Sequence, residues 1–393
     1  MEVSSDGFVQ TLRKKCERCG CMNRLKIYRL CLIAALILSI LLFWFYGRWY
    51  VNSRIPDVIR VGEGEEQTLD LGIKEVSVQA VQKQRVIPGG IPVGIYLETD
   101  GVYVVGTGEV VSVDGLTYEP AYQIVQTGDY ILAVNGRQVE DKDELIECVQ
   151  ACQSDIMILK VLRGSEVIQV RISAVETEEN YKLGIWVKDD IQGIGTLTYV
   201  TENMQFGALG HGITDTDTGE LLDVSGGSLY DTSILEIVKG EKGEPGEISG
   251  MITYSARHVR GSIMKNTPAG IFGTADSQIR QQIQTAPVEV AFKQEIVPGK
   301  ACIRSSVSGE LKEYEVEIQE IRLNENDVNK GMVFQVTDPE LLELTGGIIQ
   351  GMSGSPILQN GKLVGAVTHV FVNDPAKGYG IFAETMLDAS SGQ

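Results

Sequence analysis

Hydrophobic residues form one unbroken block near the N-terminus of this chain. Within the segment 27–46, the run Leu30–Tyr46 is apolar throughout except for Ser39. This length is close to the roughly 20 residues that a helix needs to span a bilayer. Trp44 and Trp49 are typical of the membrane–water interface. A transmembrane helix is therefore predicted at 27–46.

A cleaved signal peptide is the alternative interpretation of the same run. Its hydrophobic region would be shorter, and a cleavage site made of small residues would follow it. Here bulky aromatic residues and Arg48 follow instead. We therefore expect an uncleaved anchor.

Beyond the anchor, the apolar residues fall into short runs separated by glycine and polar residues. Residues 47–85 are expected to form a tether with some strand content, exposed around Glu63, Glu65 and Glu66, or alternatively to add a strand to the next domain. The segment 86–175 combines strand-like runs with one helix that Asp141 caps. From 180 to 393 helix signals nearly vanish, and many short strands with glycine turns predict a β-barrel or sandwich. The fold class is therefore mainly β.

The distribution of charge separates the basic N-terminus from an acidic body. Residues 1–50 contain eight Lys/Arg and three Asp/Glu, whereas the remainder contains 26 and 50. An acidic body excludes a nucleic-acid partner, because phosphate binding requires a basic face. Basic residues precede the apolar run, and such residues favour the cytoplasmic side of a membrane. We therefore expect the tail 1–26 to lie in the cytoplasm and everything after residue 50 to lie outside it.

The cysteines indicate neither a metal centre nor a disulfide framework. Cys16, Cys19 and Cys21 cluster before the anchor, but a zinc site would need a fourth ligand and only Cys31, inside the span, is close. Juxtamembrane thiols open to acylation are expected instead. We predict no metal and no cofactor.

The stretch Gly351–Pro356, with the sequence GMSGSP, carries the candidate chemistry. A serine between glycines can occupy a tight turn that exposes its hydroxyl and directs backbone N–H groups toward one point. An Asn-Gly pair at 360–361 between two apolar runs predicts a hairpin directly afterwards. The alternative is an ordinary glycine-rich loop that enters this hairpin.

A nucleophilic serine needs a base, and histidine is the natural one. The chain has three, of which His211 lies in the small-residue segment 207–215, His258 has basic neighbours that indicate the surface, and His369 lies in an alternating strand. The residue pattern alone does not select the orienting carboxylate. Asp338 precedes Pro339 and so has an alternative role as a helix N-cap.

Two segments resemble known families. The segment Gly128–Gly136 (GDYILAVNG) resembles the G-D-x-I-x-x-V-N-G segment of PDZ domains. This resemblance implies that Val93, Gly94, Ile95 and Tyr96 form the loop that receives a peptide carboxylate, with the peptide added as a strand. The alternative is a groove filled by the protein's own chain. A PDZ domain is thus expected at 86–175.

The segments 350–356 and 365–375, together with 207–215, resemble the SpoIVB (stage IV sporulation protein B) peptidase family. The resemblance implies a serine peptidase with a chymotrypsin-like double β-barrel at 180–393. It assigns Ser353 as nucleophile, His211 as general base and Asp338 as orienting carboxylate, with the N–H groups of Gly351 and Ser353 as the oxyanion hole. Met352 stands where digestive proteases have an aspartate, so activation by a new N-terminal ammonium group is not available.

The same resemblance implies a role in endospore formation. Such a peptidase crosses the forespore membrane into the intermembrane space, cuts its own tether, and cleaves a regulatory membrane protein that restrains an intramembrane protease, which leads to sigma factor activation. The alternatives are a general quality-control protease with a PDZ domain and a non-catalytic PDZ scaffold. Broad degradation of casein would indicate the former, and a lack of fluorophosphonate labelling the latter.

Overall fold

The computed structural model describes residues 28–51, 55–62, 67–70, 74–151, 156–215 and 218–392. Its chain divides into two compact units, Met1–Ala80 and Val81–Gln393. The cytoplasmic tail with Cys16, Cys19 and Cys21 lies outside the described residues, as do Glu63, Glu65 and Glu66 of the tether.

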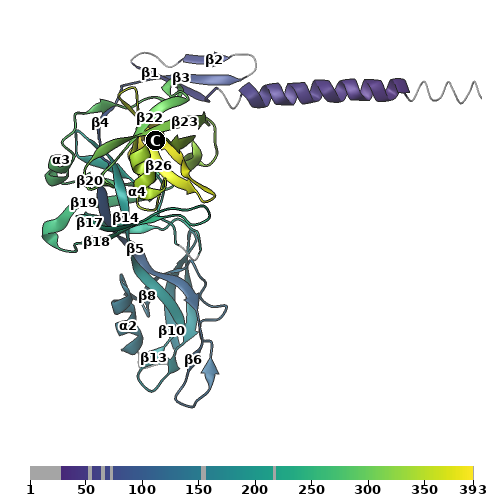
Figure 1. Ribbon diagram of the computed structural model, residues 1–393. Helices are drawn as coiled ribbons and strands as arrows, with labels where there is room; N and C mark the ends of the chain where they lie inside the picture. The colour runs from purple at the N-terminus through teal and green to yellow at the C-terminus, as the bar shows by residue number, and fades with distance from the viewer. Residues whose placement is uncertain are drawn as a thin grey trace, which may run out of the picture. The chain divides into compact units, whose positions relative to one another are not determined.

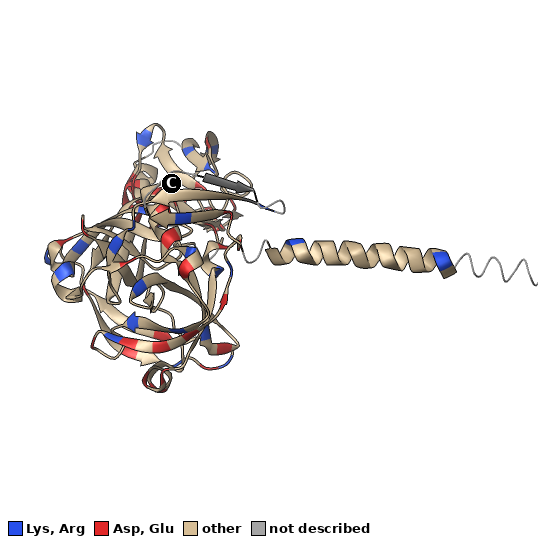
Figure 2. Cartoon of the chain, turned by 90° about the horizontal axis from the view of Figure 1, so that it is seen from above, with Lys and Arg blue, Asp and Glu red and all other residues tan. Residues whose placement is uncertain are grey.

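The first unit contains an N-terminal helix and a small sheet. The helix Tyr28–Val51 has 24 residues, a mean hydropathy of 2.5 and no buried share within the protein. Basic residues lie only near its ends (Figure 2). This composition and length fit a single-pass membrane anchor or a signal sequence. The segment expected to be a tether contains a three-stranded sheet in the order β1-β3-β2, in which β2 and β3 pair antiparallel; its strands are β1 (Val58–Gly62), β2 (Gln67–Asp70) and β3 (Glu75–Val81).

In the second unit, six strands close into a first antiparallel barrel. Each strand pairs with the next in the order β5-β16-β19-β20-β15-β14, and β14 pairs back with β5. Apolar side chains such as Val93, Leu197 and Phe206 fill its interior. The strands are β5 (Pro92–Thr107), β14 (Ile185–Thr201), β15 (Gln205–Ala208), β16 (Val224–Tyr230), β19 (Val259–Thr267) and β20 (Gly270–Ala275).

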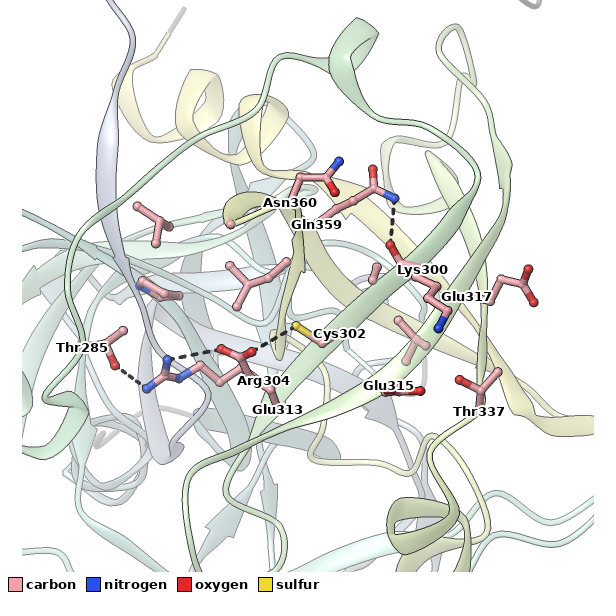
Figure 3. A pocket seen from close by; sticks show the side chains of 16 residues that line it. Thr285, Lys300, Cys302, Arg304, Glu313, Glu315, Glu317, Thr337, Gln359 and Asn360 are labelled. Atoms are coloured by element: carbon pink, nitrogen blue, oxygen red, sulfur yellow. Dashed lines mark hydrogen bonds and ion pairs between the residues drawn. The ribbon is translucent and has the colours of Figure 1, made fainter.

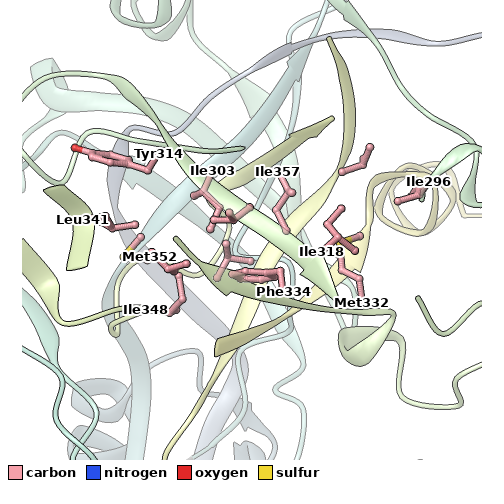
Figure 4. Close-up of a cluster of buried hydrophobic side chains, with 14 of the residues drawn as sticks. Ile296, Ile303, Tyr314, Ile318, Met332, Phe334, Leu341, Ile348, Met352 and Ile357 are labelled. Atoms are coloured by element: carbon pink, nitrogen blue, oxygen red, sulfur yellow. The ribbon is translucent and has the colours of Figure 1, made fainter. Parts of the chain in front are cut away.

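A second closed barrel follows in the order β22-β23-β24-β27-β26-β25. In β23 every second residue from Tyr314 to Ile318 is buried, as the alternating sequence predicts. These side chains meet Phe334 and Met352 in one apolar core (Figure 4). The strands are β22 (Gly299–Ser305), β23 (Lys312–Ile321), β24 (Met332–Val336), β25 (Pro356–Gln359), β26 (Lys362–Phe371) and β27 (Asp374–Phe382). The chymotrypsin-like double barrel is thus confirmed.

The PDZ domain is inserted into the first barrel instead of preceding it. The distal halves of β5 and β14 continue beyond the barrel and pair with each other as far as Thr107 and Ile185 (Figure 1). They join β8, β10 and β11 in one sheet, and α2 packs on the core of this insert. Its elements are β6 (Val110–Val111), β7 (Thr117–Tyr118), β8 (Tyr130–Val134), β9 (Arg137–Gln138), α2 (Lys142–Gln150), β10 (Ile156–Arg163), β11 (Glu166–Ser173), β12 (Val175–Glu176) and β13 (Tyr181–Lys182).

The structure therefore divides the chain differently from the expected boundaries at 86–175 and 180–393. Residues 91–97 pack into the barrel core, whereas 102–187 pack into the core of the insert. The remaining elements of the second unit are β4 (Arg85–Pro88), β17 (Thr232–Val238), β18 (Glu247–Ile252), η1 (Ala256–His258), α3 (Ser277–Ile283), β21 (Val288–Glu289), η2 (Lys293–Glu295), η3 (Val328–Lys330), α4 (Pro339–Thr345) and α5 (Ala383–Ser391).

Candidate active site

Ser353 lies on a tight turn between α4 and β25. Gly351 and Gly354 both have φ values of +95°, a region that side chains with a Cβ rarely adopt. A side chain at Gly354 would also collide with the backbone of Thr196 and Leu209. Met352 is fully buried in the core of the second barrel and so fixes the turn to that core (Figure 4). The sequence GMSGS therefore folds into a turn whose serine lies at the surface of the barrel.

The backbone of this turn leaves two N–H groups available. Among the described residues, the N–H groups of Gly351 and Ser353 donate no hydrogen bond, whereas that of Met352 donates to Ile349 O over 3.1 Å. Two unengaged donors that flank a nucleophile are what an oxyanion hole requires. Thr196 holds the turn from β14, since its Oγ1 donates to Gly351 O over 2.7 Å and its N–H to Ser353 O over 3.0 Å.

The hydroxyl of Ser353 donates to the carbonyl oxygen of Thr368, on β26, over 2.8 Å. Thr368 is itself fixed, because its Oγ1 donates to Asn329 O over 2.6 Å. The serine side chain is thus oriented by the backbone of β26 in this arrangement, with His369 as the next residue along the strand.

His211 follows β15 and lies against the same part of β26. Its ring contacts that of His369 with 5.0 Å between centroids, and Gly210 packs on Val367 and Thr368. The ring atom Nδ1 lies 2.9 Å from Gly212 O. Because a carbonyl oxygen only accepts, Nδ1 carries the proton and Nε2 keeps its lone pair, as a general base requires. The structure therefore brings the loops of His211 and Ser353 together beside Thr368 and His369.

Burial is the main influence on the charge of His211. Desolvation lowers its pKa below 6.5, the hydrogen bond to Gly212 opposes this shift, and repulsion from His369 adds to it. The imidazole is thus held neutral at physiological pH, the state that can accept a proton.

Asn266 supports the segment after His211, a role that sequence reasoning did not identify. Its Oδ1 accepts from Ile213 N over 2.9 Å, and its Nδ2 donates to the carbonyl oxygens of Ile213 and Leu222 over 2.8 and 2.9 Å. A single asparagine in strand β19 carries no motif that would distinguish it. Only the fold reveals its position next to the histidine.

Asp338 caps helix α4. One carboxylate oxygen accepts from Leu341 N over 3.0 Å and the other from Glu315 N over 3.2 Å. Within the described residues, no hydrogen bond joins Asp338 to His211. The structure thus shows the N-cap role that the Asp-Pro pair predicts.

The four residues expected to form the PDZ carboxylate loop lie elsewhere, and this expectation is corrected. Val93, Gly94, Ile95 and Tyr96 belong to the middle of β5, where Gly94–Tyr96 pair with β14 on one side and β16 on the other. Their backbone groups are therefore engaged in the barrel. In the insert, residues 185–188 of β14 pair with β5, and α2 contacts this strand.

A separate cavity of about 730 Å³ opens on β22 and β23 (Figure 3). Within it, Cys302 Sγ donates to Glu313, which also lies 3.8 Å from Arg304. Burial and the nearby Glu313 carboxylate raise the pKa of the Cys302 thiol to about 12. The thiol therefore stays protonated and is a poor nucleophile. Neither His211 nor Ser353 lines this cavity.

Comparisons with known proteins identify both modules of the second unit. The family model for the SpoIVB peptidase S55 matches residues 179–387, and that for a PDZ domain matches 119–163. No curated protein matches the chain.

Two solved structures illustrate the similarities. The PDZ domain of the SdrC-like protein from Listeria monocytogenes is 22% identical, with 22% of this chain and 87% of that chain covered and a TM-score of 0.18. The inactive form of the Rv3671c protease from M. tuberculosis is 13% identical, with 51% and 83% covered and a TM-score of 0.29. Because the S55 model spans more than half of the residues, this chain belongs to the SpoIVB peptidase S55 family and carries a PDZ domain within it.

Proposed function

We propose that this protein is a membrane-anchored serine endopeptidase with Ser353 as nucleophile and His211 as general base. The observation that carries the proposal is the convergence of three features beside β26. These are a serine on a tight turn between glycines at positive φ, two N–H groups of that turn that donate no hydrogen bond among the described residues, and a partly buried imidazole in the tautomer that accepts a proton.

In the proposed reaction, the Ser353 hydroxyl turns from Thr368 O toward His211. Its oxygen bonds to the scissile carbonyl carbon, and its proton passes to Nε2 of His211. The Gly351 and Ser353 N–H groups stabilise the oxyanion, each by about 3 kcal/mol. The C–N bond then breaks as His211 returns the proton to the departing amine, and water hydrolyses the resulting ester.

We propose Asp338 as the carboxylate that orients His211 in the active state, because the family resemblance implies this role. In that state its capping bonds would be exchanged for the Nδ1–H of His211. Until then the Gly212 carbonyl holds the same proton. The resting arrangement would thus be a precursor in which the imidazole is already correctly protonated.

The substrates we propose are the protein's own tether and a regulatory membrane protein that restrains an intramembrane protease during sporulation. The N-terminal anchor and the family support this assignment, and the localisation is the forespore membrane with the body in the intermembrane space. The PDZ insert would bind a peptide as an added strand. The contact between α2 and β14, whose residues 185–188 pair with β5, supports this site.

The test is fluorophosphonate labelling of the full chain in detergent micelles. Wild type is expected to be labelled and Ser353→Ala not. Equal labelling of the two would overturn the proposal and favour a scaffold. Casein degraded to many fragments, in place of one or two discrete cuts in the chain itself, would favour a quality-control protease.

A further inference from the structure

The segment that follows His211 is held from two directions. Residues 213–215 and 218–222 form two antiparallel arms, here named the His211 hairpin, in which Leu222 N donates to Ile213 O and Thr214 bridges Leu221. At its base the hairpin is bonded by Asn266 of the first barrel. At its tip and at its exit toward β16 it is bonded by the PDZ insert.

Three side chains of the insert make the contacts beyond the base. Tyr103 Oη of β5 lies 2.9 Å from Thr218 Oγ1, and Tyr130 Oη of β8 accepts from Asp223 N over 3.0 Å. Lys188 Nζ of β14 lies 3.6 Å from a carboxylate oxygen of Asp215. The tip is thus tied to β5 and β14 of the insert, and the exit toward β16 is tied to β8.

This contact is buried. The rings of Tyr103 and Tyr130, opposite each other across the β5–β8 pair, lie 4.9 Å apart and enclose Leu222 in one apolar cluster. The Asp215 side chain is only 3% exposed, so its ion pair with Lys188 is shielded from water on that side. A charge in this setting depends strongly on its partner.

We propose that the PDZ insert positions His211 for catalysis, with Tyr103 and Lys188 as positioning residues that act through the His211 hairpin. The inference rests on the proposed function. Along residues 185–188 the strand that carries Lys188 pairs with β5 and contacts α2, and its other end bonds the Ser353 turn through Thr196. A peptide bound beside this strand would therefore act on both catalytic loops.

The experiment compares matched variants of the full chain in detergent micelles. Tyr103→Phe removes the hydroxyl that bonds Thr218, whereas Tyr118→Phe removes an exposed hydroxyl that bonds Asp114 within the insert. Lys188→Met is matched by Lys160→Met, an exposed lysine of β10. The rate of fluorophosphonate labelling is measured against pH for each variant, together with hydrogen exchange of residues 211–223.

Tyr103→Phe and Lys188→Met are expected to label about 10-fold more slowly than wild type, by analogy with small misplacements of catalytic groups. Their hairpin amides should exchange faster. Their pH midpoint should move upward, because a less buried imidazole is easier to protonate. The controls should behave like wild type. A Tyr103→Phe/Thr218→Val double variant should lose no more than either single change.

Equal labelling, exchange and pH midpoint in the Tyr103→Phe and Tyr118→Phe variants would overturn this inference alone. Wild type that labels no better than Ser353→Ala would instead overturn the proposed function, and this inference with it. The two failures are therefore distinguishable.

Discussion

The burial of His211 predicts how activity responds to pH. Its pKa lies below 6.5 because burial, with a contribution from His369, disfavours the charged imidazole. We expect the rate of fluorophosphonate labelling to fall on acidification, since the base must be neutral. The midpoint should lie below 6.5 if the Gly212 carbonyl holds Nδ1–H during the reaction as it does here, and should lie higher if the Asp338 carboxylate takes its place. His369→Asn removes one source of repulsion and should move the midpoint upward. His258→Asn, whose ring bonds Asp231, is the control and should leave it unchanged.

Asp338 allows a prediction that separates its two roles. Asparagine caps helices about as well as aspartate, whereas alanine costs about 0.5–2 kcal/mol of stability. If Asp338 orients His211 during the reaction, Asp338→Asn should keep the unfolding temperature and lower kcat by about 10⁴-fold. Asp338→Ala should lower both. An Asp338→Asn variant with near-normal kcat would reduce Asp338 to a cap and leave the Gly212 carbonyl as the orienting group.

Local sequence predicts single residues only where their neighbours in the chain define the role. The GMSGS turn could be recognised because glycines at 351 and 354 are required by its backbone. The N-cap role of Asp338 was likewise visible in the residue that follows it. Asn266 could not be found, because its two partner residues, Ile213 and Leu222, lie more than 40 residues away in the chain.

Strand β14 connects the Ser353 turn with the rest of the first barrel. Thr196 Oγ1 donates to Gly351 O and Thr198 Oγ1 to Gly354 O, over 2.7 and 2.8 Å, so the two threonines are a matched pair. Replacement of either by valine leaves a carbonyl without its donor and should cost about 1–3 kcal/mol of stability. Only Thr196→Val releases Gly351, whose N–H group is one of the two proposed oxyanion donors.

We therefore expect Thr196→Val to slow labelling about 10-fold more than Thr198→Val does, although both variants lose the same stability. One oxyanion donor stabilises the transition state by about 3 kcal/mol, and a partly displaced donor loses part of that stabilisation. Stability is measured by urea unfolding. Equal rates in the two variants would show that the Gly351 backbone is held by the turn alone.

Elements with strong local signals were predicted well. Asp141 caps α2 by accepting from Glu144 N, and Asn360-Gly361 joins β25 to β26 with both residues at positive φ. The carboxylate loop of the PDZ domain was misplaced for a physical reason. Residues 93–96 have the apolar pattern of a loop-and-strand segment, but nothing local shows that β5 continues from the barrel into the insert.

At the scale of the whole molecule, the insertion changes what the two modules can do to each other. A PDZ domain on a flexible linker would alter activity only through local concentration, whereas here two long strands belong to both cores. The apolar patterns predicted two modules and a mainly β fold, and the family resemblances implied that these modules are a PDZ domain and a serine peptidase. They could not predict the insertion, because pairing between residues 92–107 and 185–201 is non-local.

The proposed function, through the family resemblance, predicts self-cleavage in the segment 47–85. The described part of this segment holds β1, β2 and β3, and the expected exposed glutamates lie between β1 and β2. Chain between short strands is a preferred site of proteolytic cutting. Incubated wild type should therefore release a soluble form whose N-terminus, read by sequencing, lies between residues 47 and 85. Ser353→Ala should stay intact, and mixing it with wild type tests whether cutting occurs between molecules. Release from Ser353→Ala at the wild-type rate, in the absence of wild type, would assign the cut to another protease.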